Sequence, residues 1–120
     1  IDGDNDERVD NVCFIIRGGN EAWADLLWAH RSWLYSEIVF INGKRVYDYT
    51  FQPVSQNSVI TLCHEMFHAL GAPDLYHYNS GEVYYSPCGG WDIMDGGSGE
   101  MGAYMKYRYG HWIDEIPQIS

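Results

Sequence analysis

The sequence predicts an α+β fold with a small twisted sheet, one long helix, a long glycine-rich loop and a short C-terminal helix. Three observations lead to this prediction. β-rich apolar segments flank the pair Asn42-Gly43, which is a strong hairpin signal. Apolar residues then recur at helical spacing between residues 56 and 70. Residues 71–99 are rich in glycine and have no periodicity, so we expect a functional loop there.

The first half of the chain is expected to supply the strands and one helix. Residues 11–17 are apolar and β-rich and predict a buried strand. After the breaker Gly18-Gly19-Asn20, a helix is expected from Glu21 to about His30. Residues 37–41 and 44–51 predict the two strands of the hairpin. The expected core positions of the helix are Trp23, Leu26, Leu27 and Trp28, and His30 is interpreted as structural.

The first ten residues form an acidic segment. Its aspartates alternate in a way that could wrap Ca²⁺, a hard cation that takes several oxygen ligands. Only the first half of an EF-hand loop fits, because Glu7 replaces the turn glycine and Cys13 replaces the bidentate glutamate. A plain solvated loop explains these residues equally well. The candidate calcium ligands are Asp2, Asp4, Asp6 and Asp10.

The helix expected from about Gln56 to Leu70 carries the strongest chemical signal. The polar residues 56–58 supply its start signals, and Gly71 and Pro73 are expected to end it. It contains His64-Glu65-Met66-Phe67-His68, the H-E-x-x-H arrangement of zinc hydrolases. Residues four apart share a helix face, so both imidazoles could reach one metal ion. Glu65 is rotated from that face by roughly 100° and could instead reach a water molecule.

A third ligand is expected just after this helix. A turn at Gly71 could bring the carboxylate of Asp74 back to the two imidazoles. An open catalytic zinc site needs three protein ligands plus a water. A helix with two ordinary surface or core histidines is the competing interpretation. Other candidates for the third ligand are Glu82, Asp92 and Asp95.

A second constellation is the glycine-rich segment at residues 89–97. In zincins with a Met-turn, a methionine in such a segment forms an apolar floor under the metal. An ordinary loop with one buried methionine is the alternative. Because the segment follows an H-E-x-x-H-x-x-G-x-x-D pattern, we favour the Met-turn interpretation for Met94.

Residues 64–76 and 90–95 closely resemble the secreted bacterial metallopeptidases of the immune inhibitor A family, which belong with the metzincin-like zincins. Residues 10–16 look like the family's strand that enters the active-site half. Residues 101–113 are similar to the helix and Gly-Trp segment after its Met-turn. The resemblance covers most of the chain and implies a single catalytic domain over residues 1–120.

The resemblance implies a zinc endopeptidase that hydrolyses proteins or peptides with a metal-activated water. His64, His68 and Asp74 are then the zinc ligands. Glu65 is the general base and Met94 is the Met-turn residue. A secreted, periplasmic or cell-surface bacterial protein is implied as well. Some metzincins carry a tyrosine where this chain has Gly96, and the candidates to replace it are Tyr76, His77 and His111.

Two other functions compete with a peptidase. A zincin fold could serve only in adhesion or partner binding, with weak catalysis or none. The intact Glu65 argues against this function, because a degenerate peptidase has no physical need for that carboxylate. A structural zinc domain is the other competitor. A closed structural site normally has four protein ligands, and nothing near His64 and His68 completes such a set.

Composition limits the partners. Seventeen acidic residues against seven basic ones give a formal net charge of −10, so we expect no nucleic acid and no anionic membrane surface as a partner. No segment is apolar enough to insert into a membrane. The chain begins at Ile1, and we expect it to be an excised part of a longer precursor with a pro-segment. The sequence leaves the oligomeric state open.

The chain has an odd number of cysteines, so they cannot all pair within it. We favour three buried free thiols. A bridge between Cys63 and Cys88 is the alternative, since these residues precede the first expected ligand and the Met-turn segment. The remaining cysteine is Cys13.

Overall fold

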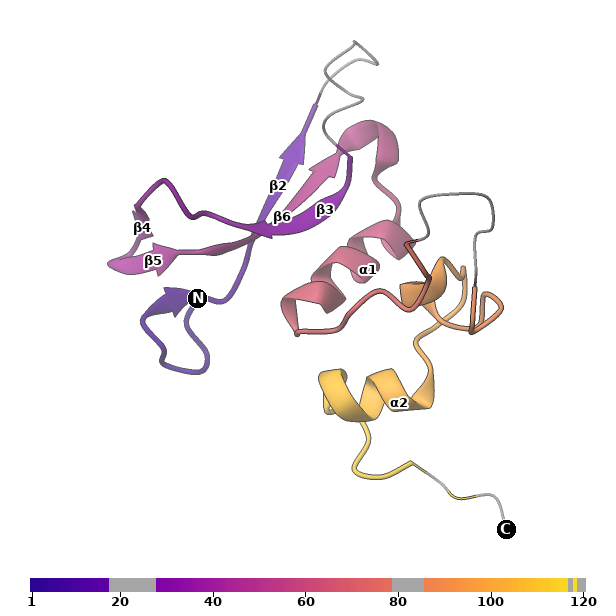
Figure 1. The fold of residues 1–120 in the computed structure, drawn as a ribbon. Coiled ribbons are helices and arrows are strands. Elements are labelled where there is room, and N and C mark those ends of the chain that lie inside the picture. The colour runs from indigo at the N-terminus through magenta and orange to yellow at the C-terminus, as the bar shows by residue number, and fades with distance from the viewer. Residues whose placement is uncertain (18–27, 79–85, 117, 119–120) are drawn as a thin grey trace. The chain divides into compact units, whose positions relative to one another are not determined.

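The computed structural model describes residues 1–17, 28–78, 86–116 and 118, which form two compact units, Ile1–Ala69 and Leu70–Ser120 (Figure 1). Small sheets and few helices make up these residues, in agreement with the predicted α+β class. Most of the helix expected from Glu21 lies outside the described residues, as does Glu82. Among the described residues, none of the helices has both the length and the apolar character that a membrane crossing requires.

A mixed sheet forms the main layer of the first unit (Figure 1). Its strands are β2 (Val12–Ile16), β6 (Asp48–Pro53) and β3 (His30–Trp33), with β6 in the middle. β2 runs parallel to β6 and β3 runs antiparallel to it. His30 therefore begins a strand, and the prediction that a helix reaches this residue is wrong. The reason is non-local: β3 gains its backbone hydrogen bonds from β6, a pairing that no helical pattern near His30 reveals.

The prediction that residues 11–17 form a buried strand is half right. The strand exists as β2, but its three central residues are exposed. β2 lies at the edge of the mixed sheet, and the described helix of this unit, Val59–Ala69, packs mainly on β6 and β3. Its exposed apolar side chains, Phe14 and Ile15, are therefore not covered by that helix.

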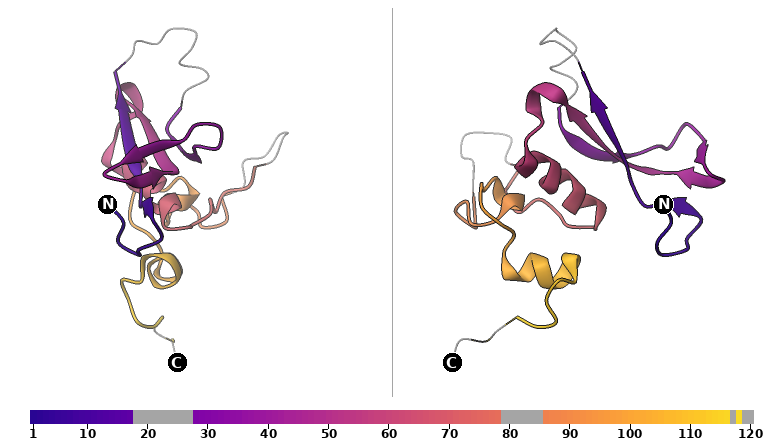
Figure 2. Two further views of the ribbon diagram at one scale, coloured as in Figure 1. Left: turned by 90° about the vertical axis from the view of Figure 1, so that its left-hand side faces the viewer. Right: turned by 180° about the vertical axis from the view of Figure 1, so that it is seen from behind.

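A smaller sheet contains the predicted hairpin. Its strands are β1 (Arg8–Val9), β5 (Lys44–Val46) and β4 (Val39–Ile41), with β5 in the middle. β4 and β5 are antiparallel and are joined by Asn42 and Gly43, whose φ angles are 49° and 77°. Positive φ at both turn residues is the signature of the type I′ turn that an Asn-Gly pair favours. The hairpin is thus confirmed, and Figure 2 shows it projecting beyond the mixed sheet.

The single strand expected over residues 44–51 is divided at Tyr47 into β5 and β6. The residues before Tyr47 pair with β4 and β1, and the residues after it pair with β2 and β3. Asp48, the first residue of β6, accepts a 2.8 Å hydrogen bond from Nδ2 of Asn11, which precedes β2. The same carboxylate pairs with Arg31 of β3. One aspartate therefore ties β6 to the polypeptide on both of its sides.

The helix that carries the H-E-x-x-H motif, α1 (Val59–Ala69), begins later than the expected position near Gln56. A 3₁₀ turn, η2 (Val54–Gln56), comes first, and Asn57 after it has an extended conformation that interrupts the helical geometry. Ser58 then caps α1, because its Oγ accepts a 3.0 Å hydrogen bond from the backbone N–H of Thr61. Such a cap contributes about 0.5–2 kcal/mol to helix stability.

α1 packs on the mixed sheet through contacts with β6 and β3. Phe67 on this helix is only 2% exposed and is the largest apolar side chain in the core of the unit. The helix ends at Ala69, and Gly71 follows with a left-handed φ of 93°. This confirms the predicted stop. Among the described residues of this unit, the buried ones are Val9, Val46, Thr50, Gln52, Glu65 and Phe67.

The second unit is built around a 3₁₀ turn and a short helix. The turn is η3 (Ile93–Asp95), and the helix is α2 (Ala103–Met105), which continues as the π-helical segment η4 (Lys106–Gly110). The helix expected over residues 100–109 is therefore present, but it starts at Ala103 and changes its hydrogen-bond pattern after one turn. Among the described residues of the second unit, the buried side chains are Ala72, Asp92, Ile93, Met94, Asp95 and Met105.

Candidate metal centre

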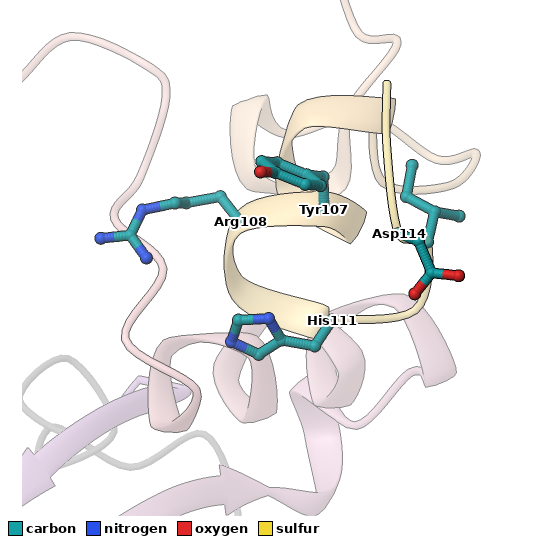
Figure 3. A pocket seen from close by; sticks show the side chains of 5 residues that line it. Tyr107, Arg108, His111 and Asp114 are labelled. Carbon is teal, nitrogen blue, oxygen red and sulfur yellow. The ribbon is translucent and has the colours of Figure 1, made fainter. Parts of the chain in front are cut away.

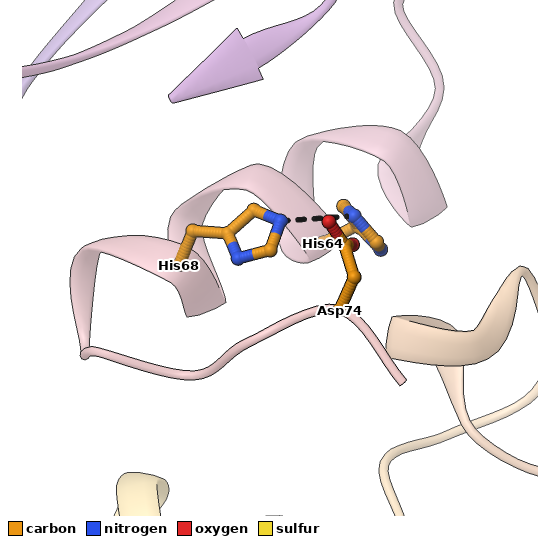
Figure 4. Close-up of side chains that lie close together, drawn as sticks. All are labelled: His64, His68 and Asp74. Atoms are coloured by element: carbon orange, nitrogen blue, oxygen red, sulfur yellow. Dashed lines mark hydrogen bonds between the residues drawn. The ribbon is translucent and has the colours of Figure 1, made fainter. Parts of the chain in front are cut away.

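Three side chains that the sequence singles out lie together at the C-terminal end of α1 (Figure 4). Nε2 of His64 and Nε2 of His68 are 3.2 Å apart. A carboxylate oxygen of Asp74 joins them, and the ligand atoms of all three residues lie within 4.8 Å of one another. Each of the three side chains is half-buried. We call these three residues the triad.

The local sequence explains this convergence. The four-residue spacing on α1 places both imidazoles on one face of the helix. Gly71, with its left-handed φ, then reverses the chain, and Pro73 cannot extend the helix. The chain direction therefore changes between His68 and Asp74, and the carboxylate of Asp74 is grouped with the imidazole pair (Figure 4).

The donor geometry fits zinc. Two ligands of a tetrahedral Zn²⁺, each bound at about 2.0–2.1 Å, are separated by about 3.3 Å. The 3.2 Å between the two Nε2 atoms agrees with that value. Neutral imidazoles whose nitrogens are this close must either share a proton or both face a cation, because their lone pairs otherwise repel. Two imidazoles and one carboxylate are also a donor set that Zn²⁺ accepts.

Asp74 is held by a tyrosine that no motif in the sequence indicates. The hydroxyl of Tyr78 donates a hydrogen bond to Oδ2 of Asp74. The hydroxyl of Tyr76 lies 3.3 Å from that of Tyr78, and the two rings meet edge to face with centroids 5.0 Å apart. Neither residue belongs to a recognisable ligand spacing. Only the conformation of the chain after Gly71 brings Tyr78 to the carboxylate.

Glu65 follows His64 directly on α1 and is only 7% exposed. It carries a carboxylate in a largely water-excluded position of the same helix that holds the two imidazoles. A carboxylate there can accept a proton, and low exposure strengthens its hydrogen bonds.

Met94 lies inside η3 and is fully buried, with 0% exposure. Its carbonyl oxygen accepts a 2.8 Å hydrogen bond from the backbone N–H of Leu75, the residue after Asp74. The backbone N–H of Met94 donates to Oδ1 of Asp92 at 2.8 Å, and Oδ2 of Asp92 accepts the backbone N–H of Gly102 at 2.6 Å. One buried carboxylate and one backbone hydrogen bond thus fix the methionine turn beside the segment that carries Asp74.

Asp92 and Asp95, two of the alternative third ligands, have other partners. Asp92 caps η3 as described, and Oδ2 of Asp95 accepts hydrogen bonds of 2.7 Å from Oγ of Ser86 and from the backbone N–H of Cys88. Both carboxylates organise the glycine-rich segment. Among the described residues, Asp74 is the acidic residue that the structure brings to the imidazole pair.

The three residues considered as replacements for the metzincin tyrosine lie in different places. Tyr76 contacts Tyr78, and His77 is exposed. His111 lines an open hollow of about 250 Å³ at the end of η4 (Figure 3). None of the residues that line this hollow belongs to the triad. The other lining residues are Tyr107, Arg108, Ile113 and Asp114.

The acidic N-terminal loop brings Asp2, Asp4 and Asp10 within the same 4.8 Å limit, whereas Asp6 is not part of this group. The ammonium group of Lys44 lies 2.8 Å from Oδ2 of Asp2. This hydrogen bond and the charge of Lys44 lower the pKa of Asp2 below its ordinary value. Calcium binding by the loop therefore stays a prediction, with a lysine already in contact with one of its carboxylates.

All three cysteines are free thiols. Cys13 and Cys63 are exposed and Cys88 is half-buried, so the expectation of buried thiols is wrong for the first two. Burial raises the pKa of the Cys88 thiol, and the nearby charges of Asp95 and Asp92 add to this increase.

The H-E-x-x-H motif on α1 and the triad fit a class of protein, the metallopeptidases, in which such a helix supplies metal ligands and an acid. Comparison with known families agrees with that class. A family model described as the catalytic domain of the immune inhibitor A peptidase M6 family matches residues 15–106, a stretch that contains α1, the triad and η3. The chain belongs to this family. A comparison with curated proteins finds no match.

Proposed function

We propose that this chain is the catalytic domain of a zinc-dependent endopeptidase that cleaves peptide bonds in proteins. The observation that carries the proposal is the convergence of two imidazoles and one carboxylate within 4.8 Å, in a chain of the M6 peptidase family. In this proposal His64, His68 and Asp74 hold the metal. The family supports protein or peptide substrates, and export from a bacterial cell belongs to the same proposal.

Glu65 is the proposed general base. Zinc, when bound, supplies Lewis acidity that polarises a peptide carbonyl and lowers the pKa of a water toward about 7. A carboxylate oxygen of Glu65 takes the proton of the attacking water and passes it to the nitrogen of the leaving amine. Asp74 brings negative charge to the centre, so we expect a less acidic water than three histidines would give.

Met94 has a supporting role in this proposal. Its buried side chain forms part of the apolar core of the methionine turn. Its carbonyl oxygen accepts the backbone N–H of Leu75, the residue that follows Asp74. The turn therefore fixes the position of the backbone that carries the third ligand.

The test joins zinc content to peptidase activity. Elemental analysis should find one zinc per chain, and the chain should cleave unfolded casein in a reaction that a chelator stops and zinc restores. Glu65→Gln should keep its zinc and lose activity by roughly 10² or more, because only the proton acceptor is removed. Glu37→Gln, at an exposed glutamate, is the matched control.

The possible results separate the competing functions. Full activity in Glu65→Gln would reject this carboxylate as the base. Stoichiometric zinc without cleavage would favour a binding or adhesion module that keeps the fold, and absence of zinc would reject the metal centre itself.

A further inference from the structure

Tyr78 contacts the triad from outside the metal-binding set. Its hydroxyl donates a hydrogen bond to Oδ2 of Asp74, whereas Oδ1 of the same carboxylate is shielded from solvent. The two oxygens of this carboxylate therefore have different surroundings. A hydrogen bond to one oxygen of a ligand carboxylate is a recognised way to fix its orientation and its mode of coordination.

We propose that Tyr78 is a positioning residue for the third metal ligand. By holding Oδ2, the phenol makes Asp74 a monodentate ligand that binds through Oδ1. This inference rests on the proposed zinc site. Its physical reason is that a catalytic zinc keeps an open position for water, and a carboxylate that bound through both oxygens would occupy that position.

The phenol is itself held in place. The side chain of Tyr78 is 76% exposed, so solvent alone would leave its ring free to change rotamer. The half-buried Tyr76 packs edge to face against it, with ring centroids 5.0 Å apart, and its hydroxyl lies 3.3 Å from the Tyr78 hydroxyl. Leu75 lies between Asp74 and Tyr76 in the sequence, and its backbone N–H donates a 2.8 Å hydrogen bond to the carbonyl oxygen of Met94. The turn thus sets where Asp74 lies, and Tyr78 sets how its carboxylate is oriented.

The first test is the zinc affinity of the full chain, measured by competition with a chromophoric chelator. Tyr78→Phe keeps the ring and removes only the hydroxyl, and it should weaken zinc binding by about 10- to 100-fold. Tyr104→Phe removes the hydroxyl of another exposed tyrosine and should leave the affinity unchanged. Thermal unfolding of the metal-free variants checks that both are folded.

A second readout reports the coordination itself. Co²⁺ in place of zinc gives a visible absorption band that is strong for four-coordinate and weaker for five-coordinate metal. Tyr78→Phe should weaken this band, because the released carboxylate can bind through both oxygens. A band of wild-type shape and intensity in Tyr78→Phe would overturn the inference.

A double-mutant cycle tests whether Tyr78 acts through Asp74. In the Asp74→Ala background, Tyr78→Phe should cause no further loss of zinc affinity. The inference is overturned if Tyr78→Phe costs as much in that background as in the wild type, or if it costs nothing while Asp74→Ala alone weakens binding. If neither Asp74→Ala nor His68→Ala changes the affinity, the proposed zinc site fails instead.

Discussion

Among the described residues, two groups of side chains gather metal-ligand atoms within the same 4.8 Å limit, and they differ in what else contacts them. In the N-terminal loop, Asp2 lies 2.8 Å from the Lys44 ammonium, and Asp10 accepts the backbone N–H of Gly3 at 3.0 Å. In the triad, two imidazoles on one helix face lie with a carboxylate, and all three side chains are half-buried.

The difference teaches that proximity of acidic groups is weak evidence for a metal. The loop already neutralises part of its negative charge with a lysine and with backbone amides. The triad mixes nitrogen and oxygen donors, which suits zinc, and its geometry follows from the helix period and the turn at Gly71. We therefore expect the two groups to respond very differently to the same changes.

The largest expected effect separates the two groups by zinc affinity. His68→Ala removes one of three donors and should weaken zinc binding by more than the 10- to 100-fold that is typical for loss of an outer-shell partner. Asp10→Asn, in the loop, should leave zinc affinity unchanged. Chelator competition measures both variants, and a similar loss in the two would refute the distinction drawn above.

Calcium affinity offers a second comparison of the loop with the triad. Ca²⁺ takes six to eight oxygen ligands, so the imidazole pair should not hold it, and Lys44 competes for Asp2 in the loop. Calorimetric titration of the metal-free chain should therefore find Ca²⁺ binding no tighter than about 10⁻⁴ M. Tighter binding that Asp4→Asn abolishes would show that the loop is a calcium site.

A smaller effect, on stability, is expected when the N-terminal cap of α1 is removed. Ser58→Ala removes the cap of α1 and should lower the free energy of unfolding by about 0.5–2 kcal/mol. Ser36→Ala, at an exposed serine outside helices and strands, is the control. Denaturant titration measures both variants. Equal stabilities would mean that the cap does not support the helix that carries the imidazoles.

The smallest effect concerns the ion pair of the loop. Lys44 lowers the pKa of Asp2, so the pair stabilises the fold above the unfolded pKa of Asp2, and this stabilisation is lost as the pH falls through the lower folded pKa. Asp2 and Glu7 raise the pKa of Lys44. The contribution of charged Lys44 to the stability of the fold is therefore lost only when the pH rises through that higher pKa.

Lys44→Met should therefore destabilise the chain slightly between about pH 5 and 9 and have less effect near pH 2. Thermal unfolding at several pH values measures the difference. An effect of the substitution that did not change between neutral and acidic pH would show that lost packing, and not the charge pair, is responsible.

Local signals in the sequence predicted the structure well. Asn42-Gly43 forms the expected turn because both residues tolerate positive φ, and Gly71 ends α1 for the same reason. The cap by Ser58 lies among the polar residues expected to start the helix. In each case the information is contained in a few neighbouring residues.

Non-local pairings account for the errors. β3 begins at His30 with two polar residues, and it exists because β6 offers hydrogen bonds to it. The division of β5 from β6 at Tyr47 depends on two different sets of strand neighbours. The exposure of β2 depends on its place at a sheet edge, which apolar composition does not reveal.

The candidate metal centre shows the same difference between local signals, which could be predicted, and non-local contacts, which could not. His64 and His68 could be paired from spacing alone, since the helix period fixes their geometry. The position of Asp74 after Gly71 favoured it as the third ligand, but Asp92 stayed an alternative, because an aspartate that caps a turn and one that faces a metal look alike in sequence. The contact between Tyr78 and Asp74 depends on the path of the chain after Gly71, so it could not be anticipated either.

The turn at Gly71 has a consequence for the way an ion would influence the molecule. All three donors come from one uninterrupted stretch, residues 64–74, and a loop this short closes with little loss of chain entropy. Ion capture would therefore suppress fraying at one helix terminus, in addition to stabilising the folded state as a whole. On chelation we expect the largest increase in amide hydrogen exchange in the last turn of α1, and a smaller one in the strands.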